Sequence, residues 1–214
     1  MEGRIRQVLK KGSLGLQMPR HVGQVKHMHL LPLADRLKLP TGCQTRWYRF
    51  VGRFIPGRTV LDVGSGDGNG LKTLLDCGAA AVMGIDPLPV GDSVENTDVS
   101  MIPDKSWDWA VAMDVIEHVE HDLAFLQHLL RVAKEGVVFT TPNWNQWGCG
   151  NDFHVREYTP TELLELLKKA IHISSWTTEI WLVNANVLLD PWRPATLLPD
   201  ENAANFGVVL QKGP

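Results

Sequence analysis

The chain has 214 residues, of which 44% are hydrophobic, and this length suits a single domain with a sizeable buried core. Its formal net charge is -3, and its three cysteines, Cys43, Cys77 and Cys149, are too widely spaced for a disulfide framework or a zinc site. No apolar stretch approaches the roughly 20 residues that span a bilayer, and the N-terminus lacks the apolar region of a signal peptide, so we expect a cytoplasmic protein without a membrane span.

Positive charge is concentrated near the N-terminus. Residues 1–53 hold eleven Lys or Arg residues against Glu2 and Asp35, whereas the rest of the chain holds ten basic and twenty-two acidic residues. A basic segment of this kind can dock on the acidic rest of the chain, stay solvated, or attract an anionic partner such as nucleic acid or a membrane surface. We favour docking on the chain or solvation over an anionic partner. We predict a basic N-terminal extension or cap over residues 1–44 and one domain over residues 45–214.

The first predicted element is an amphipathic helix over residues 45–54, which places Trp47, Phe50, Val51 and Phe54 on one face. A buried strand is predicted over residues 59–63, and the chain then breaks into a loop with glycine at alternate positions, 64, 66, 68 and 70. Glycines let the backbone turn sharply and approach a ligand closely. The strand, the loop and the helix predicted over residues 71–77 therefore indicate a ligand site.

Two ligand classes compete for this loop. A dinucleotide fold requires G-x-G-x-x-G, but Asn69 occupies the sixth position counted from Gly64. Asp62 directly before the loop would repel a pyrophosphate and suits a ligand with an ammonium or sulfonium charge. The D-x-G-x-G pattern resembles the first motif of class I S-adenosylmethionine-dependent methyltransferases. The resemblance implies that Asp62, Gly64, Ser65 and Gly66 bind this cofactor.

An acidic residue ends the second predicted strand, which covers residues 80–85. Asp86 lies twenty residues after Gly66, a spacing that brings a carboxylate to the neighbouring strand end, where it can accept both hydroxyls of a ribose. This spacing does not separate NAD from S-adenosylmethionine, and Asp-Pro is also a common turn former. The resemblance implies that Asp86 and Pro87 lie in the cofactor site.

Residues 87–99 contain prolines and polar residues and are predicted to form a loop without the usual helix. Asp98 and Val99 resemble the adenine-binding stretch of the same family, in which an Asp accepts from the adenine amino group and the next N–H donates to the ring.

A strand is predicted over residues 107–113, and the resemblance places its last residue, Met113, in the cofactor site. Residues 114–119 resemble the E-H segment of methyltransferases that act on small molecules, such as quinone-biosynthesis and glycan-cluster enzymes.

The run Glu117-His118-Val119-Glu120-His121 also raises the question of a metal site. It is not H-E-x-x-H, and His118 and His121 have no third ligand of evident placement. We therefore predict no metal.

Further along, a helix is predicted over residues 122–133, capped by Asp122 and ended by Gly136, followed by a strand over residues 137–143. Residues 151–159 resemble the H-x-x-E-[YF]-[ST] segment of glycan- and lipid-related methyltransferases. Thr159, Pro160 and Glu162 form the signature of a capping box, so a helix should run to residue 168 or 169. Strand composition at 173–183 and 205–211 predicts the last two strands, one of them antiparallel at the end of the sheet.

The resemblance covers roughly residues 45–180 and implies an α/β fold: a Rossmann-like, doubly wound, seven-stranded sheet with an antiparallel final strand. It implies transfer of a methyl group from S-adenosylmethionine to a small-molecule, glycan or lipid-precursor acceptor, at oxygen. The absence of [DNS]-P-P-[FWY] after the strand at 107–113 disfavours methylation of DNA bases, and the basic N-terminal segment is the only support for another nucleic-acid acceptor. The alternatives are a nucleotide-dependent oxidoreductase and a non-catalytic adenosyl-ligand-binding protein, and the oligomeric state stays open.

Transfer from a sulfonium needs mainly alignment of the acceptor, but a hydroxyl nucleophile benefits from a base with a pKa near neutrality. His154 is the first candidate for this base and His118 the second. A structural hydrogen-bonding role is an equal alternative for each.

Overall fold

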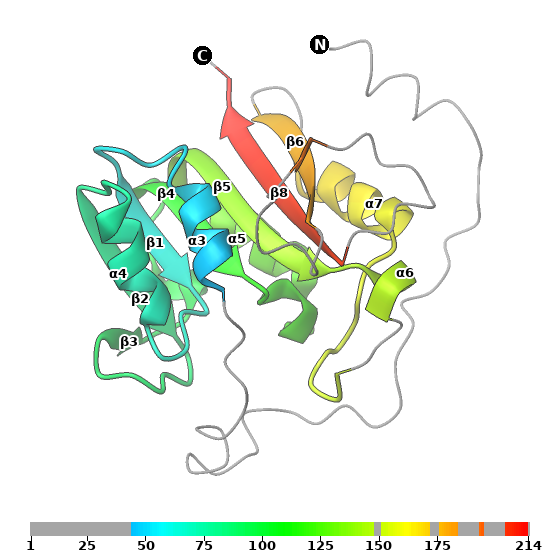
Figure 1. Ribbon diagram of the computed structural model, residues 1–214, viewed down its shortest axis with the longest axis horizontal. Coiled ribbons are helices and arrows are strands. Elements are labelled where there is room, and N and C mark those ends of the chain that lie inside the picture. Colours follow the sequence, from blue (N-terminus) through cyan, green and yellow to red (C-terminus); the bar gives the residue numbers. More distant parts are fainter. Residues whose placement is uncertain (1–43, 148–150, 172–175, 184–192, 195–203, 214) are drawn as a thin grey trace.

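The computed structural model describes residues 44–147, 151–171, 176–183, 193–194 and 204–213, and its core is one mixed sheet with helices on both faces (Figure 1). The strands are β1 (Thr59–Val63), β2 (Ala81–Asp86), β3 (Val94–Asn96), β4 (Trp107–Met113), β5 (Ala133–Pro142), β6 (Trp176–Val183), β7 (Arg193–Pro194) and β8 (Asn205–Lys212). The helices are α3 (Thr45–Val51), α4 (Asn69–Asp76), α5 (Asp122–Val132), α6 (Trp144–Trp147) and α7 (Pro160–Ala170), with 3-10 turns η2 (Val99–Met101) and η3 (Ile116–His118). The expected basic extension over residues 1–44 lies almost wholly outside the described residues.

The sheet order is β3-β2-β1-β4-β5-β8-β6-β7. Strands β1 to β5 pair in parallel, as the alternation of strands and helices predicts, and β8 runs antiparallel to both β5 and β6. The expected seven strands are not confirmed, because the described residues form eight, of which β7 has two residues. The antiparallel strand β8 lies inside the sheet, between β5 and β6, and the sheet ends in the two-residue strand β7, which is antiparallel to β6.

The two faces of the sheet carry separate apolar clusters because side chains alternate along each strand. On β4, Trp109 and Val111 pack with α3 and α4, whereas Ala110 and Ala112 face the side covered by α5 and α7. Figure 1 shows α3 and α4 on the face opposite α5. A fully buried side chain of the size of Leu61 contributes about 1.5–3 kcal/mol, so both layers hold the sheet that positions the strand ends.

Two local predictions are wrong. Residues 94–96 lie in the expected loop but form β3, in which the buried Val94 pairs with Gly84 of β2. Three residues are too few to show the alternation of buried and exposed side chains that identifies a strand in a sequence. Helix α5 ends at Val132 because β5 begins at Ala133. Gly136 therefore lies within the strand, where the indole of Trp109 covers its backbone.

The capping box of α7 is confirmed. Thr159 Oγ1 accepts from the Glu162 N–H, and the Glu162 carboxylate accepts from the Thr159 N–H at 2.8 Å, with Pro160 at the first helical position. In the described part of the chain no helix is both long enough and apolar enough to cross a bilayer.

Candidate functional site

The glycine loop between β1 and α4 has the shape expected of a ligand-binding turn. Gly64, Gly66 and Gly68 have φ values of 74°, 57° and 76°, in the left-handed region that L side chains rarely adopt. The Gly64 and Ser65 N–H groups both donate to the Ile85 carbonyl, at 2.9 and 3.1 Å, which folds the loop over the end of β2. A Cβ built on Gly66 would meet nothing within 4 Å, so open space lies next to this residue.

Asp86, the last residue of β2, connects this loop to the neighbouring strand end. One carboxylate oxygen accepts from the Gly66 N–H at 3.0 Å and the other accepts from the Leu88 N–H at 2.7 Å. Each carboxylate oxygen has two lone pairs, so each keeps an acceptor position for a ligand hydroxyl. The structure thus brings together Gly66, Asp86 and the adjoining Pro87, which the sequence placed in one site.

Asp62 lies beneath the loop and is fully buried. Its Oδ2 accepts from the Tyr48 hydroxyl at 3.0 Å and from the Ser65 hydroxyl at 2.9 Å, while its Oδ1 has no hydrogen-bond partner among the described residues. Burial raises the pKa of Asp62 to about 7, although the two hydroxyl donors oppose that shift. Asp62 and Ser65 therefore bind each other, and Tyr48 of α3, which no sequence pattern links to Asp62, completes the group.

Asp62 should make the stability of the fold depend on pH. Its folded-state pKa of about 7 lies above the ordinary value of 3.8, so the folded chain holds the proton more tightly than the unfolded chain does. This contribution to stability is full below pH 3.8 and is lost as the pH rises to about 7, a fall of about 4 kcal/mol in the free energy of unfolding. Urea unfolding of the parent and of Asp62→Asn between pH 4 and 8 measures it. The parent should lose stability relative to the variant as the pH rises, and a difference independent of pH would contradict this expectation.

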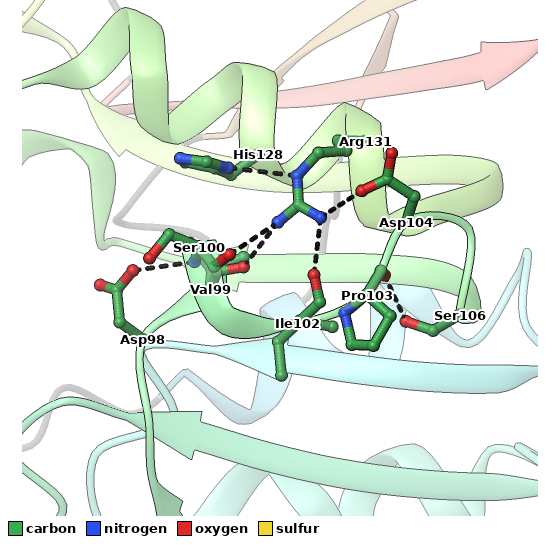
Figure 2. A network of polar contacts seen from close by, with 9 residues as sticks. All are labelled: Asp98, Val99, Ser100, Ile102, Pro103, Asp104, Ser106, His128 and Arg131. Carbon is green, nitrogen blue, oxygen red and sulfur yellow. Dashed lines mark hydrogen bonds and ion pairs between the residues drawn. The ribbon is translucent and has the colours of Figure 1, made fainter.

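One arginine side chain binds the backbone of the predicted adenine-binding stretch (Figure 2). Arg131 of α5 donates to the carbonyls of Val99, Ser100 and Ile102 and forms an ion pair with Asp104. These carbonyls belong to η2 and the residue that follows it, so the guanidinium fork fixes the course of the segment. Arg131 lies on a helix about thirty residues away from the segment that it binds, and the pattern of apolar residues along a helix does not show such a contact. Sequence reasoning missed Arg131 for that reason.

At the start of this stretch, Asp98 is exposed and Val99 is buried. The Asp98 Oδ1 accepts from the Ser100 N–H at 2.8 Å, which caps η2 (Figure 2). The other carboxylate oxygen points away from this turn in Figure 2. Asp98 thus has a defined orientation at the same edge of the sheet as Asp86.

The end of β4 is the most constrained turn of the site. Asp114, which follows the buried Met113, has a φ of 54°, an uncommon value for a residue other than glycine. Its carboxylate accepts from the indole N–H of Trp47 at 3.0 Å, from the hydroxyl of Thr140 at 2.6 Å and from the amide of Asn205 at 3.2 Å. Groups from α3, β5 and β8 therefore hold this turn in place.

The turn after β4 also meets the glycine loop. A Cβ built on Gly64 would lie 2.6 Å from Cγ2 of Val115, so the two segments are in contact. The residues that follow Val115 therefore start beside the candidate cofactor loop.

Just beyond Val115, the structure brings Glu117 and His118 of η3 together with His154 from the loop before α7. The Nδ1 of His118 lies 2.9 Å from the Phe153 carbonyl, and the Nδ1 of His154 lies 2.6 Å from the Glu157 carboxylate. Carbonyls and carboxylates accept, so in the neutral form of each imidazole Nδ1 carries the proton and Nε2 keeps a lone pair. The two rings meet edge to face, with centroids 4.8 Å apart.

Burial governs the ionisation of this cluster. It lowers the pKa of His118, which keeps the imidazole neutral near pH 7, and raises the pKa of Glu117 well above its usual range, with Asp114 adding to the rise. His154 is 8% exposed and Glu117 is fully buried. Both candidate bases of the sequence analysis thus lie in one buried polar group, which includes an acidic residue that had no assigned role.

The loop that carries His154 is tied to η3 by its backbone. The Val155 N–H donates to the Glu117 carbonyl at 2.7 Å, and Arg156 and Tyr158 both bind the carboxylate of Asp122. Asp122 therefore serves as an anchor for this loop and not as the N-cap of α5, where His121 stands.

The family model described as "Methyltransferase domain" matches residues 36–177. A probable S-adenosylmethionine-dependent methyltransferase from Mycolicibacterium smegmatis is 32% identical over 142 residues, which cover 58% of this chain and 55% of the relative. The matched part of the chain thus spans about half the length of this relative.

Several solved structures share the fold. A SAM-dependent methyltransferase from Aquifex aeolicus has a TM-score of 0.58 at 18% identity, covering 84% of this chain and 98% of that one. The Burkholderia thailandensis 1,6-didemethyltoxoflavin-N1-methyltransferase, bound to 1,6-didemethyltoxoflavin and S-adenosylhomocysteine, has a TM-score of 0.57 at 16% identity and coverages of 95% and 99%. The small RNA methyltransferase HEN1 has a TM-score of 0.61 at 17% identity, covering 92% of this chain and 27% of that one. At these identities the likeness shows the fold alone.

Proposed function

Because the chain belongs to the family of S-adenosylmethionine-dependent methyltransferases, we propose that it transfers a methyl group from S-adenosylmethionine to a small-molecule, glycan or lipid-precursor acceptor, at oxygen. The observation that carries the cofactor assignment is the carboxylate of Asp86, which holds Gly66 and the end of β2 while keeping acceptor positions for two ribose hydroxyls. The oxidoreductase alternative does not agree with the family match.

The residues around the loop fit S-adenosylmethionine. The space beside Gly66 admits a ligand at the edge of the sheet, and Asp98 and the Val99 N–H stand at the next strand end for an adenine ring. Asp62 and Ser65 support the loop from below, and the Asp62 carboxylate favours a ligand with positive charge. Pro87 and Met113 lie at the same edge of the sheet, where β2 and β4 end.

Bound S-adenosylmethionine supplies a methyl group that is already activated by its sulfonium. The protein then needs to align the acceptor and exclude water, and alignment alone corresponds to effective molarities of about 10⁵ M or more. His118 follows β4 and His154 follows β5, and both lie near the segment that touches the glycine loop. We assign to this pair the activation of the acceptor hydroxyl, a role that typically contributes about 10²- to 10⁴-fold.

The acceptor class rests on the segments around residues 114–119 and 154–159, which resemble small-molecule, glycan and lipid-related enzymes. Neighbouring folds act on a small molecule in one case and on small RNA in another, as their names state. The two segments, and not these neighbours, are the reason to place nucleic acid second among the acceptors of this chain. A protein that binds the cofactor but transfers nothing is the remaining alternative.

Calorimetric titration with S-adenosylmethionine, S-adenosylhomocysteine and NADH tests the cofactor. We expect micromolar dissociation constants for the first two ligands and no heat from NADH, because the loop lacks the dinucleotide spacing and Asp62 repels a pyrophosphate. Transfer of a radiolabelled methyl group to hydroxyl-bearing glycans, phenols and lipid precursors then identifies the acceptor. Binding of NADH alone would contradict the proposal.

A further inference from the structure

Glu117 is a buried carboxylate without an evident role in the fold. The residue is fully buried, and neither of its carboxylate oxygens has a hydrogen-bond partner among the described residues. The buried hydroxyl of Thr141 lies near enough to favour the ionised Glu117 carboxylate, but it makes no hydrogen bond of normal geometry among the described residues. A buried carboxyl group without a hydrogen bond is costly whether it is charged or neutral, so we expect something outside the chain to bind it.

The groups that face Glu117 are metal ligands by type. His118 and His154 each keep a lone pair on Nε2, since their Nδ1 atoms are occupied by Phe153 and Glu157. One ligand atom from each of the three residues lies within 4.8 Å of the others. Ligand atoms bound to one tetrahedral ion at about 2.0–2.2 Å are about 3.3–3.6 Å apart, so the widest separation in this cluster must shorten by about 1 Å, which side-chain rotation can supply.

We propose that Glu117, His118 and His154 bind one divalent transition-metal ion. Two imidazoles and one carboxylate suit zinc, manganese, iron or cobalt, whereas magnesium and calcium prefer oxygen ligands throughout. Three protein ligands leave at least one coordination position open.

The surroundings of the two histidines have the arrangement found around bound metals. A ligating histidine almost always donates its other ring N–H to a carboxylate or a backbone carbonyl, which fixes the tautomer and the direction of the ring. His154 donates to the Glu157 carboxylate and His118 to the Phe153 carbonyl. The i, i+3 spacing of His154 and Glu157 thus acquires a physical reason. If His118 and His154 only stabilised the fold, these hydrogen bonds would be explained, but the lack of a hydrogen-bond partner for Glu117 among the described residues would not.

The role of the ion rests on the proposed function. The open position would bind the acceptor hydroxyl and lower its pKa, as metal ions do for bound water. The hydroxyl proton passes to water, the O–CH₃ bond forms as the S–CH₃ bond breaks, and the sulfur keeps the electron pair and leaves as S-adenosylhomocysteine. Because both Nε2 lone pairs are then used for coordination, the histidines act as ligands and not as free bases.

Cobalt(II) titration of the chelator-treated full chain, without S-adenosylmethionine, tests the site. Visible absorption reports coordination, and calorimetry with zinc reports affinity. In the parent we expect a site that fills at one equivalent, with affinity at least 100-fold lower in His118→Ala and in Glu117→Gln. Glu157→Gln, which alters only the orienting partner, should lower affinity about 10- to 100-fold. His121→Ala is the matched control, since this exposed histidine lies three residues from His118.

The thermal midpoint of unfolding is a second readout. Metal should raise it in the parent and in His121→Ala but not in His118→Ala, and midpoints measured without metal show whether each variant is folded. Metal binding that is absent, or that His121→Ala weakens as much as His118→Ala does, would overturn the site. S-adenosylmethionine titration in the presence of chelator is independent of the ion, so loss of that binding alone would overturn the proposed function and leave the metal site intact.

Discussion

Replacing Asp86 by alanine is expected to weaken S-adenosylmethionine binding by at least 100-fold. The variant loses two acceptors for the ribose and also releases the Gly66 and Leu88 N–H groups that Asp86 holds. Hydrogen bonds to a charged group contribute about 1.5–3 kcal/mol each, so two of them correspond to a factor of about 10² to 10⁴. Calorimetric titration of the parent and the variant measures the loss.

Asp76→Ala is the matched control for this change. It removes the same charge from the last residue of α4, where Asp76 makes only an exposed ion pair with Lys72. Its binding constant should equal that of the parent, because exposed pairs contribute little. The affinity of Asp86→Asn for S-adenosylmethionine should lie between those of Asp76→Ala and Asp86→Ala. Its amide oxygen can accept from one N–H group, but its amide nitrogen, a donor, faces the other N–H group. Asp86→Ala binding within threefold of the parent would show that Asp86 does not contact the cofactor.

Gly70→Ala is expected to lower the free energy of unfolding by about 1–3 kcal/mol, the usual cost of overpacking a core, and further by the loss of the hydrogen bond between Tyr48 and Asp62. Alanine normally stabilises a helix relative to glycine by about 1 kcal/mol. In α4, however, a Cβ at position 70 would lie 2.1 Å from Cζ of the buried Tyr48 and 2.4 Å from both Cε atoms. The ring must therefore move, and its hydroxyl then loses the bond to Asp62. Urea unfolding followed by tryptophan fluorescence measures the change.

Two further variants isolate the cause. Lys72→Ala in the same helix is the control and should change the free energy of unfolding by less than about 0.5 kcal/mol. In a Tyr48→Ala background the added Gly70→Ala should cost almost nothing, because the ring that it would strike is absent. A Gly70→Ala protein as stable as the parent would mean that α3 can shift away from α4 without loss.

Local sequence patterns predicted the parts of this site that depend on neighbours along the chain. The strand before Gly64, the loop itself and Asp86 follow from spacing within one βαβ unit, and the capping box at Thr159 is a four-residue pattern. The contacts that complete the site join distant elements. Tyr48 reaches Asp62 from α3, and Arg131 reaches η2 from α5. Periodicity contains no information on such pairs, because it reports only which face of an element is buried.

The histidine cluster shows the same limit. The run that contains His118 holds no third histidine ligand, because the groups beside that histidine are its neighbour Glu117 and His154 from another loop. A usable signal was present, since Glu157 follows His154 at the spacing that allows one carboxylate to orient an imidazole. Whether an ion binds there is the question that the metal titration answers.

The position of β8 has a consequence for the order in which the chain acquires its structure. Strand β8 pairs with β5 on one side and with β6 on the other, so neither strand can complete that part of the sheet before residues 205–212 leave the ribosome. Until then β5 presents an apolar open edge, the kind of surface on which unfinished chains aggregate. Pairings between segments this far apart are also slow to form. During synthesis the half of the sheet that carries the glycine loop can therefore form first, while the half that anchors Asp114 through Asn205 cannot form until residues 205–212 are available.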